Sequence, residues 1–202
     1  CFPKDTRAIT KTADLYKTDL SIIKSVIKSN AKRKIILIDR IKKILSNKLK
    51  NKKVAILIGS ETDRTTMEAA NKYYEFFGIT AELYVKSAHR NPADVEVFAR
   101  DARNNGYAVL IGAAGMAAHL AGALKANTTL PVIGVPLPGG IEGGMDALLA
   151  TVQMPKGVPV ATMTVGKAGF INSAILSAEI FSINDSALKE KLDTFKENGA
   201  KI

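Results

Sequence analysis

From residue 53 to the end of the chain, short apolar runs alternate with longer segments in which apolar residues recur at helical spacing. The run at 54–58 is apolar at every position, which predicts a strand buried on both faces of a sheet. The strands predicted in this way are 54–58, 83–85, 107–111, 131–135 and 158–163. The predicted helices are 63–77, 92–104, 116–126, 145–151, 168–182 and 185–197.

Strands that alternate with helices predict a parallel sheet, because each parallel pair needs a crossover that returns over one face. We therefore predict an α/β fold, a three-layer α/β/α sandwich with a five-stranded parallel sheet, a C-terminal helix and a basic N-terminal arm. Ligands of such sheets bind outside the carboxyl ends of the strands. The segments expected at that edge are 59–63, 87–90, 112–119 and 139–144.

The positive charge of the chain lies mainly in its first 53 residues. The formal net charge is +10, and residues 1–53 hold 16 Lys or Arg against 4 Asp or Glu, whereas the remainder holds 13 against 15. We expect a helical arm at 1–52, a linker or the remnant of a fused upstream segment, and a globular domain at 53–202. Nucleic acid is not expected as a partner, because no helix-turn-helix, zinc or RNA-reading signature accompanies the basic residues.

Composition excludes several other classes of protein. No apolar run approaches the ~18 residues of a membrane span, so no membrane partner is expected. Cys1 is the single cysteine and His89 and His119 are the two histidines, which leaves little for a metal cage. We predict no metal, and the single thiol fits a reducing compartment such as the cytoplasm.

Two of the strand-end segments carry polar groups suited to a phosphate. Gly59, Ser60 and Asp63 precede a predicted helix, where free N–H groups attract anions and where the same side chains serve as N-caps. Ser87, His89 and Arg90 bring a hydroxyl, an imidazole and a guanidinium into four residues. Arginine binds phosphate bidentately, and histidine exchanges protons near neutral pH. For 59–63, phosphate binding and helix capping both stay open at this point, whereas for 87–90 we expect a part in binding or catalysis.

The segment from 112 to 122 consists mostly of glycine and alanine. Such a segment lets the backbone approach a planar ligand, or lets helices of two subunits pack closely. Both interpretations stay open, as does a purely structural role for His119. The glycine-rich segment at 139–144 is either a flexible cover over the site or an ordinary loop.

Five segments together resemble the N5-carboxyaminoimidazole ribonucleotide mutase family. The resemblance runs from about residue 53 to about residue 182, in order and without large gaps. The motifs are Gly59-Ser60-x-Thr62-Asp63, Ser87-Ala88-His89-Arg90-x-Pro92, Ala117-Ala118-His119-Leu120, Pro131-Val132-Ile133-Gly134-Val135-Pro136, and Val152-Gln153-Met154-Pro155-x-Gly157-Val158-Pro159-Val160-Ala161-Thr162.

The resemblance implies a flavodoxin-like catalytic domain at 53–202 that moves a carboxyl group within a ribonucleotide of de novo purine synthesis. It implies an octamer with sites shared between subunits, no cofactor, and a functional link to the ATP-dependent carboxyaminoimidazole ribonucleotide synthase. His89 would be the general acid/base, and His119 would lie near the aminoimidazole in a supporting catalytic role. Ser60 and Asp63 would contact the ribose 5-phosphate part, and Ser87 and Arg90 the phosphate.

The resemblance further implies that backbone from 112 to 118 lines the aminoimidazole. The full set of substrate-binding residues implied is Gly59, Ser60, Asp63, Ser87, Ala88, Arg90, Gly112, Ala113, Ala114, Gly115, Ala117, Ala118 and Leu120. The chain departs from the family at three positions, where the family usually has Ser, Gly and Pro and this chain has Thr62, Met116 and Ala121. Met116 adds bulk near the expected pocket.

Three alternatives remain open at this point. One is a carboxylase that adds free CO2 directly to aminoimidazole ribonucleotide. The second is a non-enzymatic flavodoxin-like binding module, which would show no turnover. The third is nucleic-acid binding by the arm, which would be salt-sensitive and lost on deletion of residues 1–52.

Overall fold

The computed structural model describes residues 3–30, 32–33, 36 and 52–202. The chain divides into two compact units, Cys1–Lys50 and Asn51–Ile202, which are treated separately below. Within the described residues, no helix is long and apolar enough to cross a membrane.

The N-terminal unit contains two amphipathic helical segments. Helix α1 spans Pro3–Leu15, and residues 21–30 form the second segment. Asp14 accepts a hydrogen bond from Lys24 Nζ at 2.6 Å, which links the two segments. Two apolar side chains of this unit are largely exposed, with Leu15 81% and Ile22 78% accessible. The predicted helical arm at 1–52 falls partly outside the described residues, at 1–2, 31, 34–35 and 37–51.

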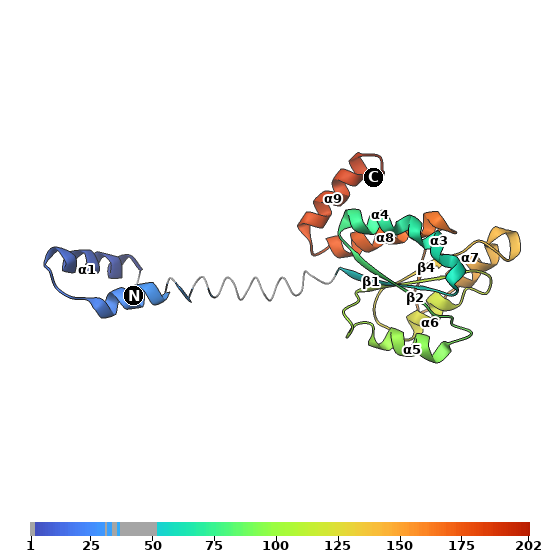
Figure 1. Ribbon diagram of the computed structural model, residues 1–202, viewed down its shortest axis with the longest axis horizontal. Helices are drawn as coiled ribbons and strands as arrows, with labels where there is room; N and C mark the ends of the chain where they lie inside the picture. Colours follow the sequence, from blue (N-terminus) through green and yellow to red (C-terminus); the bar gives the residue numbers. More distant parts are fainter. Residues whose placement is uncertain (1–2, 31, 34–35, 37–51) are drawn as a thin grey trace. The chain divides into compact units, whose positions relative to one another are not determined.

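The C-terminal unit is the predicted three-layer α/β/α sandwich (Figure 1). Its sheet has five parallel strands in the order β2-β1-β3-β4-β5, which is the flavodoxin-like order. The strands are β1 Lys53–Ile58, β2 Thr80–Val85, β3 Val109–Ala114, β4 Val132–Pro136 and β5 Ala161–Thr162. The prediction of fold class from the alternation of apolar runs and helices is confirmed.

Helices cover both faces of this sheet (Figure 1). One face is covered by α5 and α6, and the other by α3, α4 and α8, with α9 packed on α8. The α-helices are α3 Arg64–Met67, α4 Asn71–Phe77, α5 Pro92–Asp101, α6 Leu120–Ala126, α7 Met145–Val152, α8 Lys167–Ser182 and α9 Ser186–Glu197. Short 3-10 turns are η1 Glu61–Asp63, η2 Glu68–Ala70 and η3 Ile141–Gly143.

Several predicted element boundaries are wrong for local reasons. The helix predicted at 63–77 is a series of 3-10 and α segments, although its predicted apolar face is buried. The strand predicted at 158–163 contains two residues, and Pro159, which has no N–H for a sheet ladder, precedes it. The strand predicted to end near Gly112 continues to Ala114, and the helix predicted from 116 begins at Leu120.

Gly112 explains how α6 can lie so close to the sheet. A Cβ placed on Gly112 would lie 2.8 Å from the Cα and 2.9 Å from the N of Ala121. Real Cβ atoms do not approach backbone atoms so closely, so only glycine fits at this strand position. The small-residue segment therefore serves helix-on-sheet packing at its start.

A polar cluster joins β1, β2 and the segment just before β3. Glu82 receives hydrogen bonds from Tyr84 at 2.8 Å and from Tyr107, and forms an ion pair with Lys53 Nζ at 2.8 Å. Tyr84 and Tyr107 also share a hydrogen bond of 2.6 Å. The bonds from Lys53, Tyr107 and Tyr84 together lower the pKa of the Glu82 carboxyl to about 2.

We expect this cluster to stabilise the fold above pH 4.5 and to lose its effect as the pH falls toward 2. The sign follows because the folded state lowers the carboxyl pKa from 4.5, so acid must protonate a group that folding keeps charged. Glu82→Gln should therefore flatten the fall in urea midpoint between pH 4.5 and 2. The effect should be of order 1 kcal/mol or less, because the carboxylate is partly exposed. If the urea midpoint of the variant fell as steeply between pH 4.5 and 2 as that of the parent, this expectation would be contradicted.

Candidate active site

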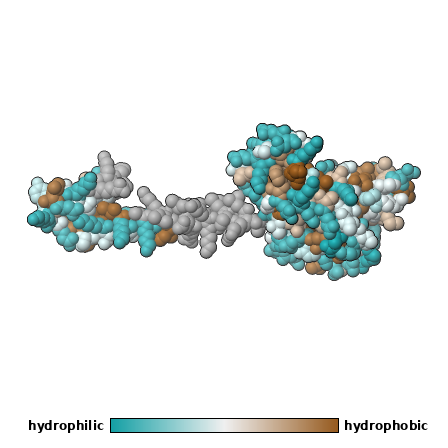
Figure 2. Space-filling view, turned by 45° about the horizontal axis from the view of Figure 1, so that its top comes forward, coloured by the Kyte–Doolittle hydropathy of each residue, from teal (hydrophilic) through white to brown (hydrophobic). Residues whose placement is uncertain are grey.

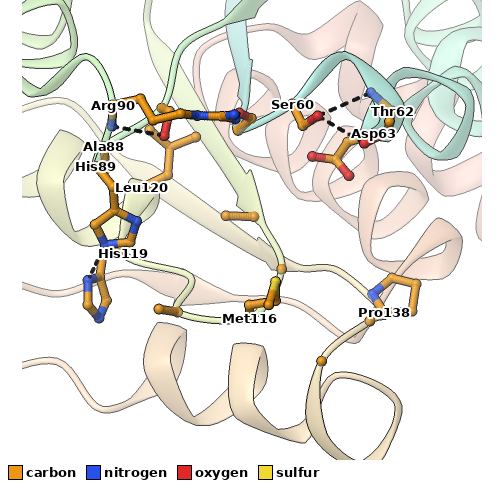
Figure 3. A pocket seen from close by; sticks show the side chains of 17 residues that line it. Ser60, Thr62, Asp63, Ala88, His89, Arg90, Met116, His119, Leu120 and Pro138 are labelled. Atoms are coloured by element: carbon orange, nitrogen blue, oxygen red, sulfur yellow. Dashed lines mark hydrogen bonds between the residues drawn. The ribbon is translucent and has the colours of Figure 1, made fainter.

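The loops that follow β1, β2, β3 and β4 surround one pocket of about 550 Å³ at the carboxyl edge of the sheet (Figure 3). This volume is typical of small-molecule sites. The lining residues are Gly59, Ser60, Thr62, Asp63, Ser87, Ala88, His89, Arg90, Ala114, Gly115, Met116, Ala117, His119, Leu120, Pro138, Gly139 and Gly140. The topology thus places the site where the strand order predicts it.

The loop after β1 places hydroxyls and a carboxylate in the pocket. Ser60 caps η1, and its Oγ accepts hydrogen bonds from Thr62 N at 3.4 Å and from Thr62 Oγ1 at 2.9 Å. Ser60 is therefore both a helix cap and a pocket residue, and its binding of a phosphate stays a prediction. Partial burial raises the pKa of the Asp63 carboxyl above its usual range, and a backbone hydrogen bond from Ser60 partly offsets this.

The loop after β2 carries a guanidinium across to the loop after β1. Ser87 Oγ accepts a hydrogen bond from Arg90 N at 3.2 Å, which shapes the turn. Arg90 Nη2 donates to Gly59 O at 2.8 Å, and the side chain lies beside Ser60 (Figure 3). A guanidinium has five N–H donors in a planar fork, so it can hold Gly59 and contact a phosphate at once. Arg90 and the nearby hydroxyls make this end of the pocket suited to an anion.

The two histidines of the chain meet at the other end of the pocket. His89 Nε2 and His119 Nδ1 lie 2.8 Å apart and share a hydrogen bond, although the residues are 30 positions apart (Figure 3). Their ring centroids are 4.9 Å apart with an interplanar angle of 68°. One facing nitrogen must carry the proton and the other must accept it, so each ring constrains the tautomer of its neighbour. The pair can take up or release a proton beside a bound ligand.

The segment after β3 contributes less of its backbone than the sequence analysis expected. Gly112 and Ala113 belong to β3 and are buried, and Ala118 is only 2% exposed. None of these three lines the pocket, so their predicted role in substrate binding is not supported by their position. The predicted residues that do line it are Gly59, Ser60, Asp63, Ser87, Ala88, His89, Arg90, Ala114, Gly115, Ala117, His119 and Leu120.

Five further residues line the pocket without having been selected as site residues from the sequence. They are Thr62, Met116, Pro138, Gly139 and Gly140. Pro138 and the two glycines follow β4, and the strand-end rule had drawn attention to 139–144 as a segment. Only its first two residues reach the pocket, where both have positive φ. Met116 also has positive φ, which fits the glycine that the family usually has at this position.

Among the residues that the structure describes, potential metal ligands do not form a cluster. No group of three or more His, Cys, Asp or Glu residues in the described part of the chain could hold a metal ion. The pocket combines Arg90 and two serine hydroxyls in one part with a histidine pair in another. This arrangement suits acid/base chemistry on a phosphorylated ligand.

Comparison with known proteins agrees with this geometry. Over 145 residues the chain is 42% identical to N5-carboxyaminoimidazole ribonucleotide mutase of Escherichia coli K12 and 48% identical to the protein of that name in Bacillus subtilis 168. These matches cover 72% of this chain and 86% and 90% of the relatives. The crystal structure of Treponema denticola PurE superimposes with a TM-score of 0.66 at 26% identity, covering 73% of this chain and 91% of that one.

The match to a whole protein family covers the entire C-terminal sandwich. Residues 53–201 match the family described as AIR carboxylase, with β1 at the start of the match and α9 near its end. The match contains all four loops that surround the pocket. The chain belongs to the AIR carboxylase family.

Proposed function

We propose that this chain is an N5-carboxyaminoimidazole ribonucleotide mutase of de novo purine synthesis. It would move a carboxyl group from the exocyclic nitrogen of the substrate to C4 of the imidazole ring. The observation that supports this most is the His89–His119 hydrogen bond of 2.8 Å at one end of a pocket whose other end holds Arg90. The curated relatives at 42–48% identity carry the name of this activity.

Substrate binding follows from the polarity of the pocket. Arg90 would hold the 5-phosphate with its guanidinium fork, and Ser60 and Ser87 lie in the same part of the pocket. Asp63 is an acceptor and would repel a phosphate, so it fits the ribose hydroxyls instead. The phosphate and ribose thus anchor the nucleotide, and the ring extends toward the histidines.

The chemistry needs one proton delivered and one removed. Breaking the N–C bond of the carbamate releases CO2, and the exocyclic nitrogen takes a proton to become the free amine. C4 then attacks the retained CO2 to form the new C–C bond, and the proton on C4 leaves. A single imidazole can deliver the first proton and accept the second, so the reaction leaves it unchanged.

We assign the proton transfer to His89 and a positioning role to His119. His89 follows Ala88 in the loop that also carries Arg90, so anchoring of the phosphate places the ring near this imidazole. His119 Nδ1 faces His89 Nε2 and constrains its tautomer and ring orientation. His119 would therefore act through His89.

A second candidate function is direct carboxylation of aminoimidazole ribonucleotide by free CO2, because the matched family is described as AIR carboxylase. Supplying the carbamate and the free aminoimidazole ribonucleotide with bicarbonate in parallel assays separates the two. We expect rapid conversion of the carbamate at low bicarbonate. Conversion of only the free nucleotide would favour the carboxylase, and turnover of neither would favour a binding module. In the pathway, an ATP-dependent synthase would supply the carbamate.

The outer face of α7 supports assembly into a homo-oligomer. Met145, Leu149 and Val152 are 48%, 50% and 51% exposed, and their spacing places them on one side of the helix. Figure 2 shows apolar surface at the end of the C-terminal unit that carries α7. Large apolar side chains exposed together on one helix face are typical of an interaction surface, so we propose that a second copy covers this face, as in the octamer that the resemblance implies.

We expect Leu149→Glu to shift the protein to smaller assemblies in analytical ultracentrifugation at micromolar concentration. The charge would enter a face that lacks partners for it, which weakens association. Val97→Glu on α5, where the native valine is 59% exposed, is the matched control and should leave the assembly unchanged. A parent protein that sediments as a monomer would contradict the proposed oligomer.

A further inference from the structure

Met116 is an unusual residue for its position in the pocket. It lies between β3 and α6 with φ of 55°, a conformation that glycine adopts without steric cost and methionine does not. Its side chain is 64% exposed and lines the pocket. A large side chain is thus held in a glycine-like conformation at the site.

The residues next to Met116 have side chains that are small or buried, so Met116 supplies most of the pocket wall in this segment. Ala114, Gly115 and Ala117 from the same segment have small side chains or none, and Leu120 is only 1% exposed. Figure 3 shows Met116 between His119 and Pro138, across the pocket from Ser60 and Asp63. The thioether is therefore the large flexible apolar group of this segment that a ligand can contact.

We propose that Met116 determines how this chain holds the aromatic ring of its ligand and how well it retains CO2. This inference rests on the proposed function. Thioether groups pack favourably on aromatic rings, and a methionine can adapt to a planar ligand. The ring would lie against the Met116 side chain, with the histidine pair beside it. The same side chain would cover the space in which CO2 waits between the breaking of the N–C bond and the formation of the C–C bond.

The covering role predicts a specific side product. If CO2 leaves the pocket before C4 attacks it, no new C–C bond forms. The exocyclic nitrogen has already taken a proton, so the product is the free amine, aminoimidazole ribonucleotide. The balance of the abortive reaction is carbamate plus one proton giving amine plus CO2. The ratio of this product to the C-carboxylated product therefore measures retention directly.

Three substitutions of Met116 separate the effect of its side chain from the effect of its backbone conformation. Met116→Leu keeps the apolar volume, Met116→Ala removes it but keeps a Cβ at positive φ, and Met116→Gly removes both. We expect Leu to behave like the parent. We expect Ala and Gly alike to raise KM roughly 3- to 10-fold, the size of the apolar contact with the ring that both variants lose and Leu keeps, and to raise the share of free aminoimidazole ribonucleotide several-fold.

Stability and binding measurements keep the proposal testable. Met116→Gly should be more stable to urea than Met116→Ala, because glycine relieves the positive φ. Ala200→Gly relieves a φ of 59° at the end of the chain and is the control, with unchanged KM and product ratio. If KM and the product ratio followed stability, so that Met116→Gly resembled the parent and Met116→Ala was impaired, the effect would belong to the backbone conformation. That result would overturn the proposal.

A binding experiment separates this inference from the proposed function. Calorimetric titration of each variant with 5-aminoimidazole ribonucleotide requires no turnover. We expect weaker binding, by a factor similar to that in KM, for the Ala and Gly variants but not for Leu. Equal affinity in all four proteins would overturn the role of Met116 even if the parent is an active mutase. An inactive parent with the expected order of affinities would instead count against the proposed reaction alone.

Discussion

His89→Asn is expected to reduce turnover by roughly 10²- to 10⁴-fold, the usual effect of removing a general acid/base. Asparagine can occupy a similar position and form hydrogen bonds, but it cannot deliver or accept the proton that the carboxyl shift requires. His89 is exposed at the end of a loop, so the fold should be unaffected. Steady-state turnover of the carbamate and a binding titration with aminoimidazole ribonucleotide would measure the two effects separately.

His119→Asn is the control within the same hydrogen bond. It should cost less than His89→Asn, because His119 acts on the orientation and tautomer of His89. The pH profile of kcat should also move in His119→Asn, since the group that faces His89 Nε2 has changed. Near-full activity of His89→Asn together with loss of activity in His119→Asn would show that the assignment of the proton carrier is reversed.

Arg90→Ala is expected to raise KM about tenfold to a hundredfold, with a smaller change in kcat. A charge-assisted hydrogen bond to phosphate contributes about 1.5–3 kcal/mol, and the phosphate is remote from the reacting atoms. The substitution also removes the bond of Arg90 Nη2 to Gly59 O, which ties the β1 and β2 loops together. Both losses act on binding, and steady-state kinetics would report them as KM.

A more conservative substitution distinguishes the contribution of the positive charge from that of the planar guanidinium group. Arg90→Lys keeps the positive charge but cannot bond to Gly59 and a phosphate with one planar group, so its KM should lie between those of the parent and Arg90→Ala. The melting temperature of both variants should stay near that of the parent, because the side chain is exposed. An unchanged KM in Arg90→Ala would remove this residue from phosphate binding.

The topology of the domain followed from the sequence because buried parallel strands are apolar at every position. The run at 54–58 and the glycines at strand ends are enough to place the carboxyl edge of the sheet. Element ends were less predictable. Helical spacing identifies the apolar face of 63–77, where Met67 and Phe77 are buried, but it does not separate 3-10 turns from α-helix.

The candidate site was predictable where residues lie directly after strands. Ser60 and Arg90 could be selected in this way, because their loops are short and begin at a buried strand. The contact between His89 and His119 could not, since it depends on how two loops 30 residues apart approach each other. The role of Gly112 could not be decided from the sequence, because a glycine that admits a helix and one that admits a ligand look the same there, and the structure shows the contact with the helix.

The central claim is that this chain moves one carboxyl group within one bound ribonucleotide. The most direct measurement uses carbamate substrate labelled with ¹³C in its carboxyl group, incubated with the purified full chain in unlabelled bicarbonate. ¹³C nuclear magnetic resonance of the product then shows the origin of the C4 carboxylate. We expect the label to be retained in the large majority of product molecules. Product that carries mainly unlabelled carboxylate would show that CO2 comes from solution and would contradict the account.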